Sequence, residues 1–116
     1  MKNLAIVAVG KYTENFITSI DIIEKFTNTF NTVYVLTDNV DKLQNYTTNT
    51  KLTYIFTHYS KDKFNYFDKL YFSLNLVLNT DKDTVYCDVA TLHRLNDYNL
   101  DNNFNGVVYP TEWGSN

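Results

Sequence analysis

The stretch "LAIVAVG", residues 4–10, decides the fold class of this chain. Leu4–Val9 contains only apolar residues, and the run ends at Gly10. Such an uninterrupted run is typical of a strand covered on both faces, as in parallel sheets with helices on each side. A chain of 116 residues is the length of one domain with one core, so we expect a single domain over residues 1–116.

Strand-like and helix-like patterns alternate after this first strand. Further strands are predicted at Thr32–Leu36, Leu52–Phe56, Thr84–Cys87 and Gly106–Tyr109. Helices are predicted after an N-cap at Thr13 and after an N-cap at Asp62, with a short helix around Val40–Leu43. This alternation predicts an α/β domain, a Rossmann-type three-layer sandwich around a mainly parallel sheet. If the second long helix crosses back over the sheet, the strand order is 3-2-1-4.

The clearest periodic signal in the sequence lies in the second long helix. Its apolar residues recur at spacings of three and four over nearly four turns, at Phe64, Phe67, Leu70, Tyr71, Leu74, Val77 and Leu78. This pattern is typical of a helix that packs one face against a sheet. We therefore predict that the whole stripe is core and serves no cofactor.

The predicted topology brings two loops to one crevice. In parallel α/β sheets, ligands bind beyond the carboxyl ends of the strands, where the winding direction reverses. With the order 3-2-1-4 this point lies between the first and fourth strands, so residues 10–12 and 88–90 form its two lips. Asp88 directly follows a buried strand, and a buried carboxylate without a partner is costly. We expect Asp88 to contact a ligand there.

Each candidate also has a structural alternative. Tyr12 is suited to stack on a base. It is also one of ten tyrosines, so a packing role in the core is the alternative. Lys69 lies on the second long helix, where it reaches a phosphate or is simply solvated. The alternative role of Asp88 is to cap the amino end of the segment that follows it. Asp38 ends the second strand and is read as a turn residue in preference to a nucleotide contact.

Composition and motifs exclude several classes of function. The chain has no glycine-rich dinucleotide or phosphate-loop motif, and His58 and His93 lack the spacing of zinc ligands. A net charge of −3 with scattered basic residues argues against nucleic-acid binding. No apolar run approaches the roughly 20 residues of a membrane span. The single Cys87 fits a reducing compartment, so we expect a cytoplasmic protein.

Four segments, in this order, resemble the amino-terminal half of glycosyltransferase family 6. They are "IVAVGKYTENFITSIDIIEKF" from Ile6, "VYVLTD" from Val33, "YCDVA" from Tyr86 and "VVYPTEWGS" from Val107. The family includes the blood-group A and B transferases and the α1,3-galactosyltransferases. The resemblance implies a GT-A fold that binds UDP-galactose or UDP-N-acetylgalactosamine. It also implies transfer of the sugar to a glycan acceptor with retention of anomeric configuration.

The resemblance also assigns site residues. It implies a uracil site at Val7, Ala8, Val9 and Tyr12, a donor contact at Lys69, and a motif for Mn²⁺ and the sugar diphosphate at Asp88, Val89 and Ala90. The family has a second aspartate where this chain has Ala90. Because a methyl group cannot ligate a metal, Asp88 alone makes a weak metal site. We expect donor binding without Mn²⁺.

The acceptor-binding half of the family, with its catalytic glutamate, matches no part of this chain. Tyr109-Pro110 stands where the family has His-Pro, and Glu112 does not align with the catalytic residue. The catalytic residues are therefore unknown, and hexosyltransferase activity of this chain is open. A nucleotide-binding or scaffold module without activity is the alternative. We expect exposed apolar surface where a further half would pack, and self-association that covers it.

Overall fold

The computed structural model describes residues 1–97, Leu100 and the backbone of residues 107–108. The strands are β1 (Lys2–Ala8), β2 (Phe30–Thr37), β3 (Thr53–His58), β4 (Thr84–Tyr86) and β5 (Val107–Val108). The α-helices are α1 (Tyr12–Ile23), α2 (Val40–Thr47) and α3 (Tyr66–Thr80), and the 3-10 helices are η1 (Glu24–Phe26) and η2 (Val89–Asp97). The segment after Val108, including Tyr109, Pro110 and Glu112, lies outside the described residues.

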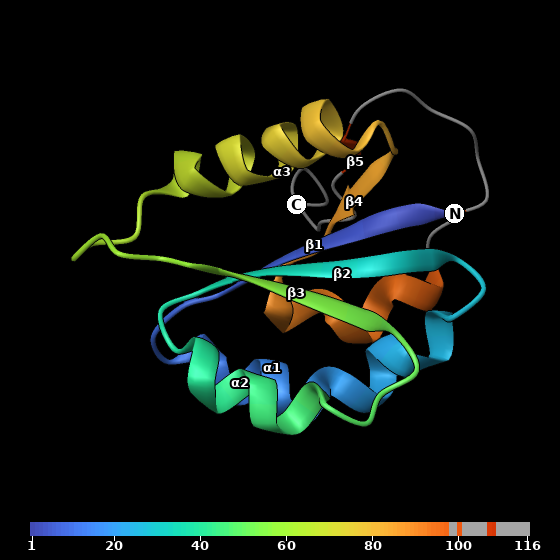
Figure 1. Ribbon diagram of the computed structural model, residues 1–116, viewed down its shortest axis with the longest axis horizontal. Coiled ribbons are helices and arrows are strands. Elements are labelled where there is room, and N and C mark those ends of the chain that lie inside the picture. The colour runs from blue at the N-terminus through green and yellow to red at the C-terminus, as the bar shows by residue number, and fades with distance from the viewer. Residues whose placement is uncertain (98–99, 101–106, 109–116) are drawn as a thin grey trace.

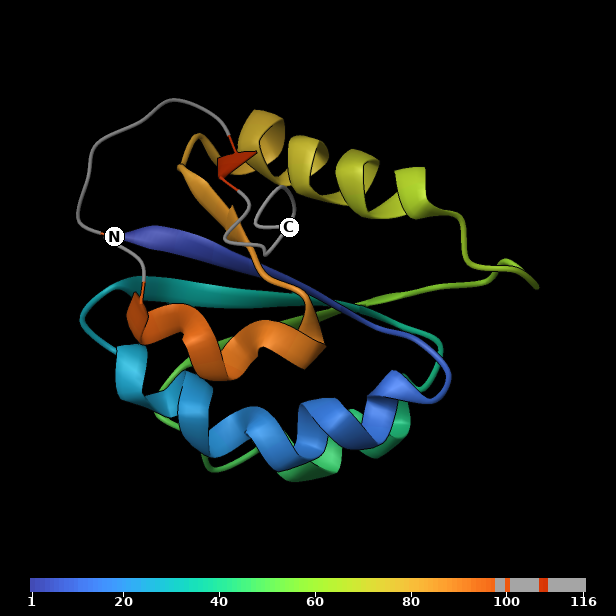
Figure 2. The same cartoon turned by 180° about the vertical axis from the view of Figure 1, so that it is seen from behind.

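The described strands form one parallel sheet in the order β3-β2-β1-β4-β5. The predicted order 3-2-1-4 is confirmed, and β5 adds to the free edge of β4. Helix α3 covers one face of the sheet, while α1, α2 and η2 cover the other (Figures 1 and 2). The chain therefore has the predicted three-layer α/β architecture. Among the described residues, no helix combines the length and apolar character needed to cross a membrane.

The two faces of the sheet bury very different amounts of apolar side chain. On β1, Leu4 and Ile6 point toward α1, while Ala5 and Val7 point toward α3, as the alternation of a strand requires. Eighteen buried residues form the cluster on the α1 side, and five form the cluster on the α3 side. The main core therefore lies between the sheet and the layer of α1, α2 and η2.

Helix α1 packs as the sequence predicts but begins earlier. Phe16, Ile20 and Ile23 are buried at helical spacing against the sheet. The predicted N-cap at Thr13 is wrong, because Lys11 is the N-cap and makes no side-chain capping bond. Thr13 lies buried in the first turn, and its N–H donates to the carbonyl of Gly10 at 3.2 Å. The turn at Gly10 therefore starts the helix directly.

Helix α3 presents its apolar stripe to solvent, so the prediction that this stripe is core is wrong. Phe67, Tyr71, Leu74 and Leu78 are 58%, 65%, 51% and 73% exposed. Lys69 and Ser73 are instead the buried positions on the sheet side of the helix. Polar contacts explain this orientation of the helix. Lys69 pairs with Asp88, and Thr80 accepts a hydrogen bond from Asn3 of β1 at 2.7 Å.

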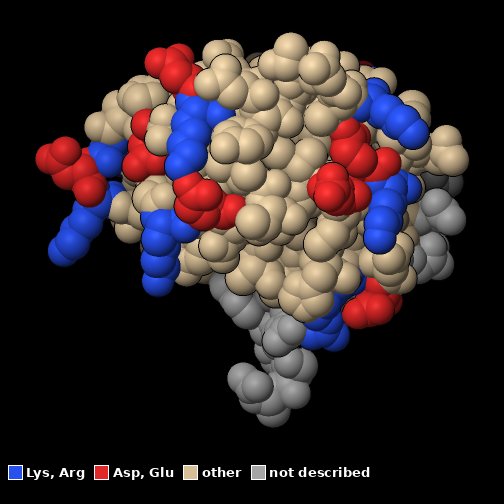
Figure 3. Space-filling view, turned by 90° about the horizontal axis from the view of Figure 1, so that it is seen from below, with Lys and Arg blue, Asp and Glu red and all other residues tan. Residues whose placement is uncertain are grey.

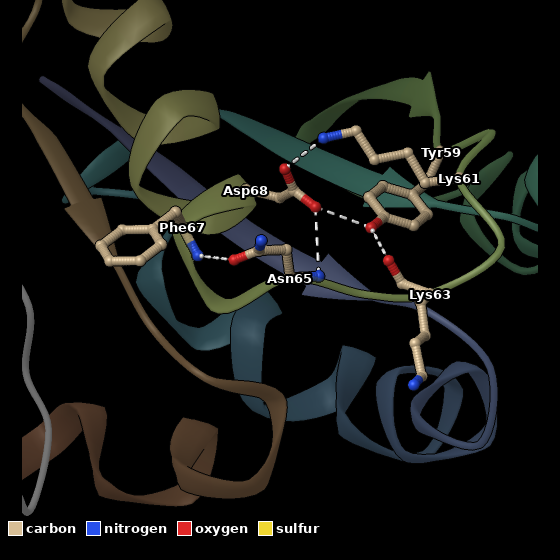
Figure 4. A network of polar contacts seen from close by, with 6 residues as sticks. All are labelled: Tyr59, Lys61, Lys63, Asn65, Phe67 and Asp68. Carbon is tan, nitrogen blue, oxygen red and sulfur yellow. Dashed lines mark hydrogen bonds and ion pairs between the residues drawn. The ribbon is translucent and has the colours of Figure 1, made fainter.

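The amino end of α3 is a polar network (Figure 4). The N-cap is Asn65 and not the predicted Asp62, because Asn65 and Asp68 form a reciprocal capping box. The Asp68 carboxylate also accepts hydrogen bonds from Lys61 Nζ at 2.6 Å and from the Tyr59 hydroxyl at 2.7 Å. These contacts fix the loop between β3 and α3 to the first turn of the helix.

Candidate functional site

A crevice of about 340 Å³ lies at the carboxyl ends of β1 and β4, between the start of α1 and the first half of α3. Its lining residues are Val7, Val9, Tyr12, Phe64, Lys69, Tyr86, Asp88, Val89 and Ala90. This is the edge where a parallel sheet of this winding binds ligands. The volume falls within the range of about 300–1,000 Å³ that is typical of small-molecule sites.

The structure brings together seven of the eight donor-site residues that the resemblance implies. Only Ala8 is absent from the lining, because its side chain is fully buried in the core on the α1 side of the sheet. Val7 and Val9 lie on the opposite side of the same strand and its extension, facing α3. Strand alternation therefore removes Ala8 from the implied set as a side-chain contact.

Lys69 and Asp88 form an ion pair in the crevice. Lys69 Nζ lies 3.3 Å from Asp88 Oδ1, and Lys69 is only 8% exposed, while the Asp88 side chain is 33% exposed. The ammonium also lies over the rings of Tyr66, 4.5 Å from the centroid, and Tyr86, at 5.4 Å. Aromatic faces attract a cation more strongly when it is desolvated. The crevice thus holds a nearly buried positive charge beside a half-exposed carboxylate.

Tyr12 stands at the mouth of the crevice, on the first residue of α1. Its ring is partly exposed, and Lys11 Nζ lies 5.3 Å from the ring centroid. The preceding turn needs glycine, because Gly10 has φ +61°. The N–H of Gly10 donates to the Asp38 carboxylate at 3.1 and 3.3 Å. The Asp38 carboxylate therefore fixes the turn at Gly10.

Two aromatic residues of the crevice were not among the predicted site residues. Tyr86 is the last residue of β4 and points toward α3, on the same side as Ala5 and Val7. Alternation counted back from Asp88 is the signal that identifies it. Phe64 had been placed in the helical stripe, but it precedes the helix and packs on Tyr59 with ring centroids 5.6 Å apart. The network around Asp68 holds Tyr59 and so positions this wall.

The crevice offers a poor ligand set for a metal ion. Asp88 is the one carboxylate among the described residues that line the crevice, and it is already paired with Lys69. Ala90 lines the crevice where the resemblance implies a second acid. Within the part of the chain that the structure describes, no three His, Cys, Asp or Glu side chains gather as a metal site. These residues do not fit Mn²⁺, and metal-independent binding stays a prediction.

Cys87 supports the floor of this site from the core. It is 1% exposed, and burial raises the pKa of its thiol to about 11. A thiol with so high a pKa is almost wholly protonated at neutral pH and a weak nucleophile. Cys87 is therefore a packing residue.

Comparison of the chain with models of protein families, with curated proteins and with solved structures found no match.

Proposed function

We propose that this crevice binds a UDP-sugar, UDP-galactose or UDP-N-acetylgalactosamine, as the donor site of a glycosyltransferase similar to family 6. The observation that carries the proposal is the meeting of Tyr12, Lys69 and Asp88 at the switch point between β1 and β4. Tyr12 supplies an aromatic face at the rim, Lys69 supplies a buried cation, and Asp88 supplies a hydrogen-bond acceptor. A nucleoside diphosphate sugar has a group for each of them.

Each part of the donor has a suitable partner in the crevice. The uracil ring stacks on Tyr12, because aromatic faces bind bases without base-specific partners. The ribose hydroxyls donate to Asp88, whose side chain is partly open to solvent. Lys69 offsets the charge of the diphosphate and of the UDP that leaves when the sugar is transferred. Stabilising such a leaving group is the main electrostatic need of the reaction.

Calorimetric titration of the full chain with UDP and with UDP-galactose, each with and without Mn²⁺, tests the proposal. We expect binding of both ligands, and a change of less than tenfold on adding Mn²⁺, which corresponds to about 1.4 kcal/mol. No heat of binding under any of the four conditions would refute the nucleotide-sugar assignment. A tenfold or larger gain with Mn²⁺ would refute metal independence alone.

Two variants separate the roles of base and diphosphate contacts. Lys69→Met removes a charge-assisted contact worth roughly 1.5–3 kcal/mol, so UDP affinity falls roughly 10- to 100-fold while uridine affinity changes little. Tyr12→Ala removes stacking worth roughly 1–3 kcal/mol and weakens uridine and UDP alike. Lys25→Met on the exposed surface of η1 makes the same charge change away from the crevice and is the matched control.

A binding module without catalysis is the second candidate. It is favoured by the pairing of the Asp88 carboxylate with Lys69, because the described lining residues then offer no unpaired carboxylate. Incubation with UDP-galactose and simple galactoside acceptors distinguishes the two candidates. Sugar transfer to the acceptor hydroxyl, with release of UDP, removes the second candidate. Binding of UDP without any transfer supports it.

A further inference from the structure

Helix α3 is apolar on two opposite faces. Phe72 and Leu76 pack toward the sheet, while Phe67, Tyr71 and Leu74 point away from it. Six of the ten large hydrophobic side chains exposed in the described structure lie on or beside this helix: Phe64, Tyr66, Phe67, Tyr71, Leu74 and Leu78. The apolar face of a helix is normally buried against another element. The outer face of α3 is therefore an interaction surface.

This outer face cannot rotate into the core without losing fixed contacts. Ser73 is fully buried against the sheet, and Lys69 is paired with Asp88 on the same side. At the carboxyl end, Thr80 accepts a hydrogen bond from Asn3 of β1. These contacts hold the helix in register along its whole length, so a partner has to come to the outer face.

We propose that the outer face of α3 binds the same face of a second copy of this chain, with the two helices antiparallel. Phe67, Tyr71, Leu74 and Leu78 follow spacings of four, three and four, which is the seam pattern of paired helices. The same patch on both subunits forms a closed two-fold interface.

The chemistry of the seam suits a second copy. Its four residues carry no charge, so two copies bring no like charges together. The charged residue next to it, Asp68, is already neutralised by Lys61. The face covered by α1 and α2 differs, because Lys, Arg, Asp and Glu side chains of both signs are spread over it (Figure 3).

The order of large and small side chains favours the antiparallel arrangement. The aromatic residues occupy the amino-terminal half of the seam, and the leucines occupy the other half. Antiparallel helices pair Phe67 with Leu78 and Tyr71 with Leu74, which keeps the spacing even. Parallel helices pair ring with ring at one end and leucine with leucine at the other. The antiparallel pair also aligns opposite helix dipoles.

The exposed area of the seam suits a dimer at the small end of the size range. With about 150–250 Å² for a whole aromatic side chain, the exposed parts of Phe67 and Tyr71 present roughly 250 Å² per copy, and the exposed Leu74 and Leu78 add to this area. A standard interface buries about 800 Å² per partner.

Sedimentation equilibrium of the full chain over about 1–200 μM tests the dimer, a range that brackets micromolar dissociation constants. We expect twice the monomer mass, with Tyr71→Glu and Leu78→Glu each weakening association at least 100-fold. Both side chains are exposed, so circular dichroism and UDP binding stay unchanged. Thr18→Glu on the exposed surface of α1 is the control and leaves the dimer intact. A monomer at every concentration, or a dimer indifferent to both seam variants, overturns the proposal.

Disulfide trapping tests the orientation. In antiparallel helices, a Phe67→Cys chain crosslinks to a Leu78→Cys chain, while two Phe67→Cys chains are held about 16 Å apart along the helix axis. Cys87 is buried and gives no background. We expect rapid crosslinking in the mixture and little in Phe67→Cys alone. Faster crosslinking of Phe67→Cys with itself overturns the antiparallel arrangement.

Discussion

Helices α1 and α3 cover opposite faces of one sheet in opposite ways. Helix α1 buries Phe16, Ile20 and Ile23 and exposes polar residues such as Glu14, which pairs with Lys42 of α2. Helix α3 buries Lys69 and Ser73 and exposes aromatic and leucine side chains. Apolar packing therefore decides how α1 lies on the sheet, whereas polar contacts decide how α3 lies.

The difference follows from what each helix does at the crevice. Helix α1 contributes its first residue, Tyr12, so its length is free to pack in the core. Helix α3 has to turn Lys69 toward Asp88, and the positions in line with Lys69 then face the sheet as well. Ser73, one turn later, is small enough to let the helix lie close. Phe72 and Leu76 still pack toward the sheet, but Phe67, Tyr71, Leu74 and Leu78 are left on the outer face.

The comparison predicts its largest effect for Phe16→Ala. This variant empties a fully buried site on α1 and lowers the free energy of unfolding by about 3–5 kcal/mol. Leu74→Ala on the outer face of α3 lowers it by less than about 0.5 kcal/mol when the protein is dilute enough to be monomeric. Urea denaturation of both variants measures the contrast.

The same two variants can also contradict the contrast between α1 and α3. If Leu74→Ala in the dilute protein destabilises as much as Phe16→Ala, the outer face of α3 packs within the monomer and the contrast between the helices fails. If the cost of Leu74→Ala grows with protein concentration, the residue acts through association. That result would support the proposed dimer, because association stabilises the folded state more at higher protein concentration.

The sequence predicted the sheet well because the sheet depends on local patterns. Uninterrupted apolar runs such as Leu4–Val9 identify buried parallel strands, and the connection rules then leave few orders. The same reasoning placed Tyr12 and Asp88 on one crevice, and the structure joins Lys69 to them. Helix α1 follows the same logic, because Phe16, Ile20 and Ile23 recur at helical spacing and the sheet covers the face that they share.

The failure at α3 has a physical cause. Periodicity shows that Phe67, Tyr71 and Leu74 share a face, but it does not show what covers that face. The direction of α3 depends on Lys69 and Asp88, which are nineteen positions apart and make a tertiary contact. The cap was missed for a similar reason, because Asp62 and Asn65 both fit the preference for N-caps. Only the reciprocal bond with Asp68 distinguishes them.

The ends of the two helices give a second, smaller prediction. Asn65→Ala removes the side-chain oxygen that accepts from the Phe67 N–H, so the free energy of unfolding falls by about 1 kcal/mol. Lys11→Ala at the start of α1 removes no capping bond and changes stability by less than about 0.5 kcal/mol. Thermal and urea unfolding compare the pair. Equal losses in the two variants would contradict the idea that polar contacts hold α3 more than α1.

Asp68 gives the smallest effect and a dependence on pH that α1 lacks. Hydrogen bonds from Lys61 and then Tyr59 hold the pKa of its carboxyl below the ordinary value. Because the pKa of Asp68 is lower in the folded state than in the unfolded state, this stabilisation is complete above the unfolded-state pKa of about 4. It is then lost as the pH falls through the folded pKa. Asp68→Asn removes the titrating group, and Lys61 stays exposed.

The measurement is the difference in unfolding free energy between the protein and Asp68→Asn, followed by urea denaturation from neutral pH to about pH 2, well below the ordinary pKa of an aspartate. We expect Asp68→Asn to be the less stable protein at neutral pH and the gap to close as the pH falls. Asp21→Asn, on the exposed surface of α1, removes the same charge away from this network and is the matched control. A gap that stays constant below pH 4 would mean that the Asp68 network acts through shape and not through charge. In that case α3 would be fixed to the crevice by its capping geometry and by the pair of Lys69 with Asp88.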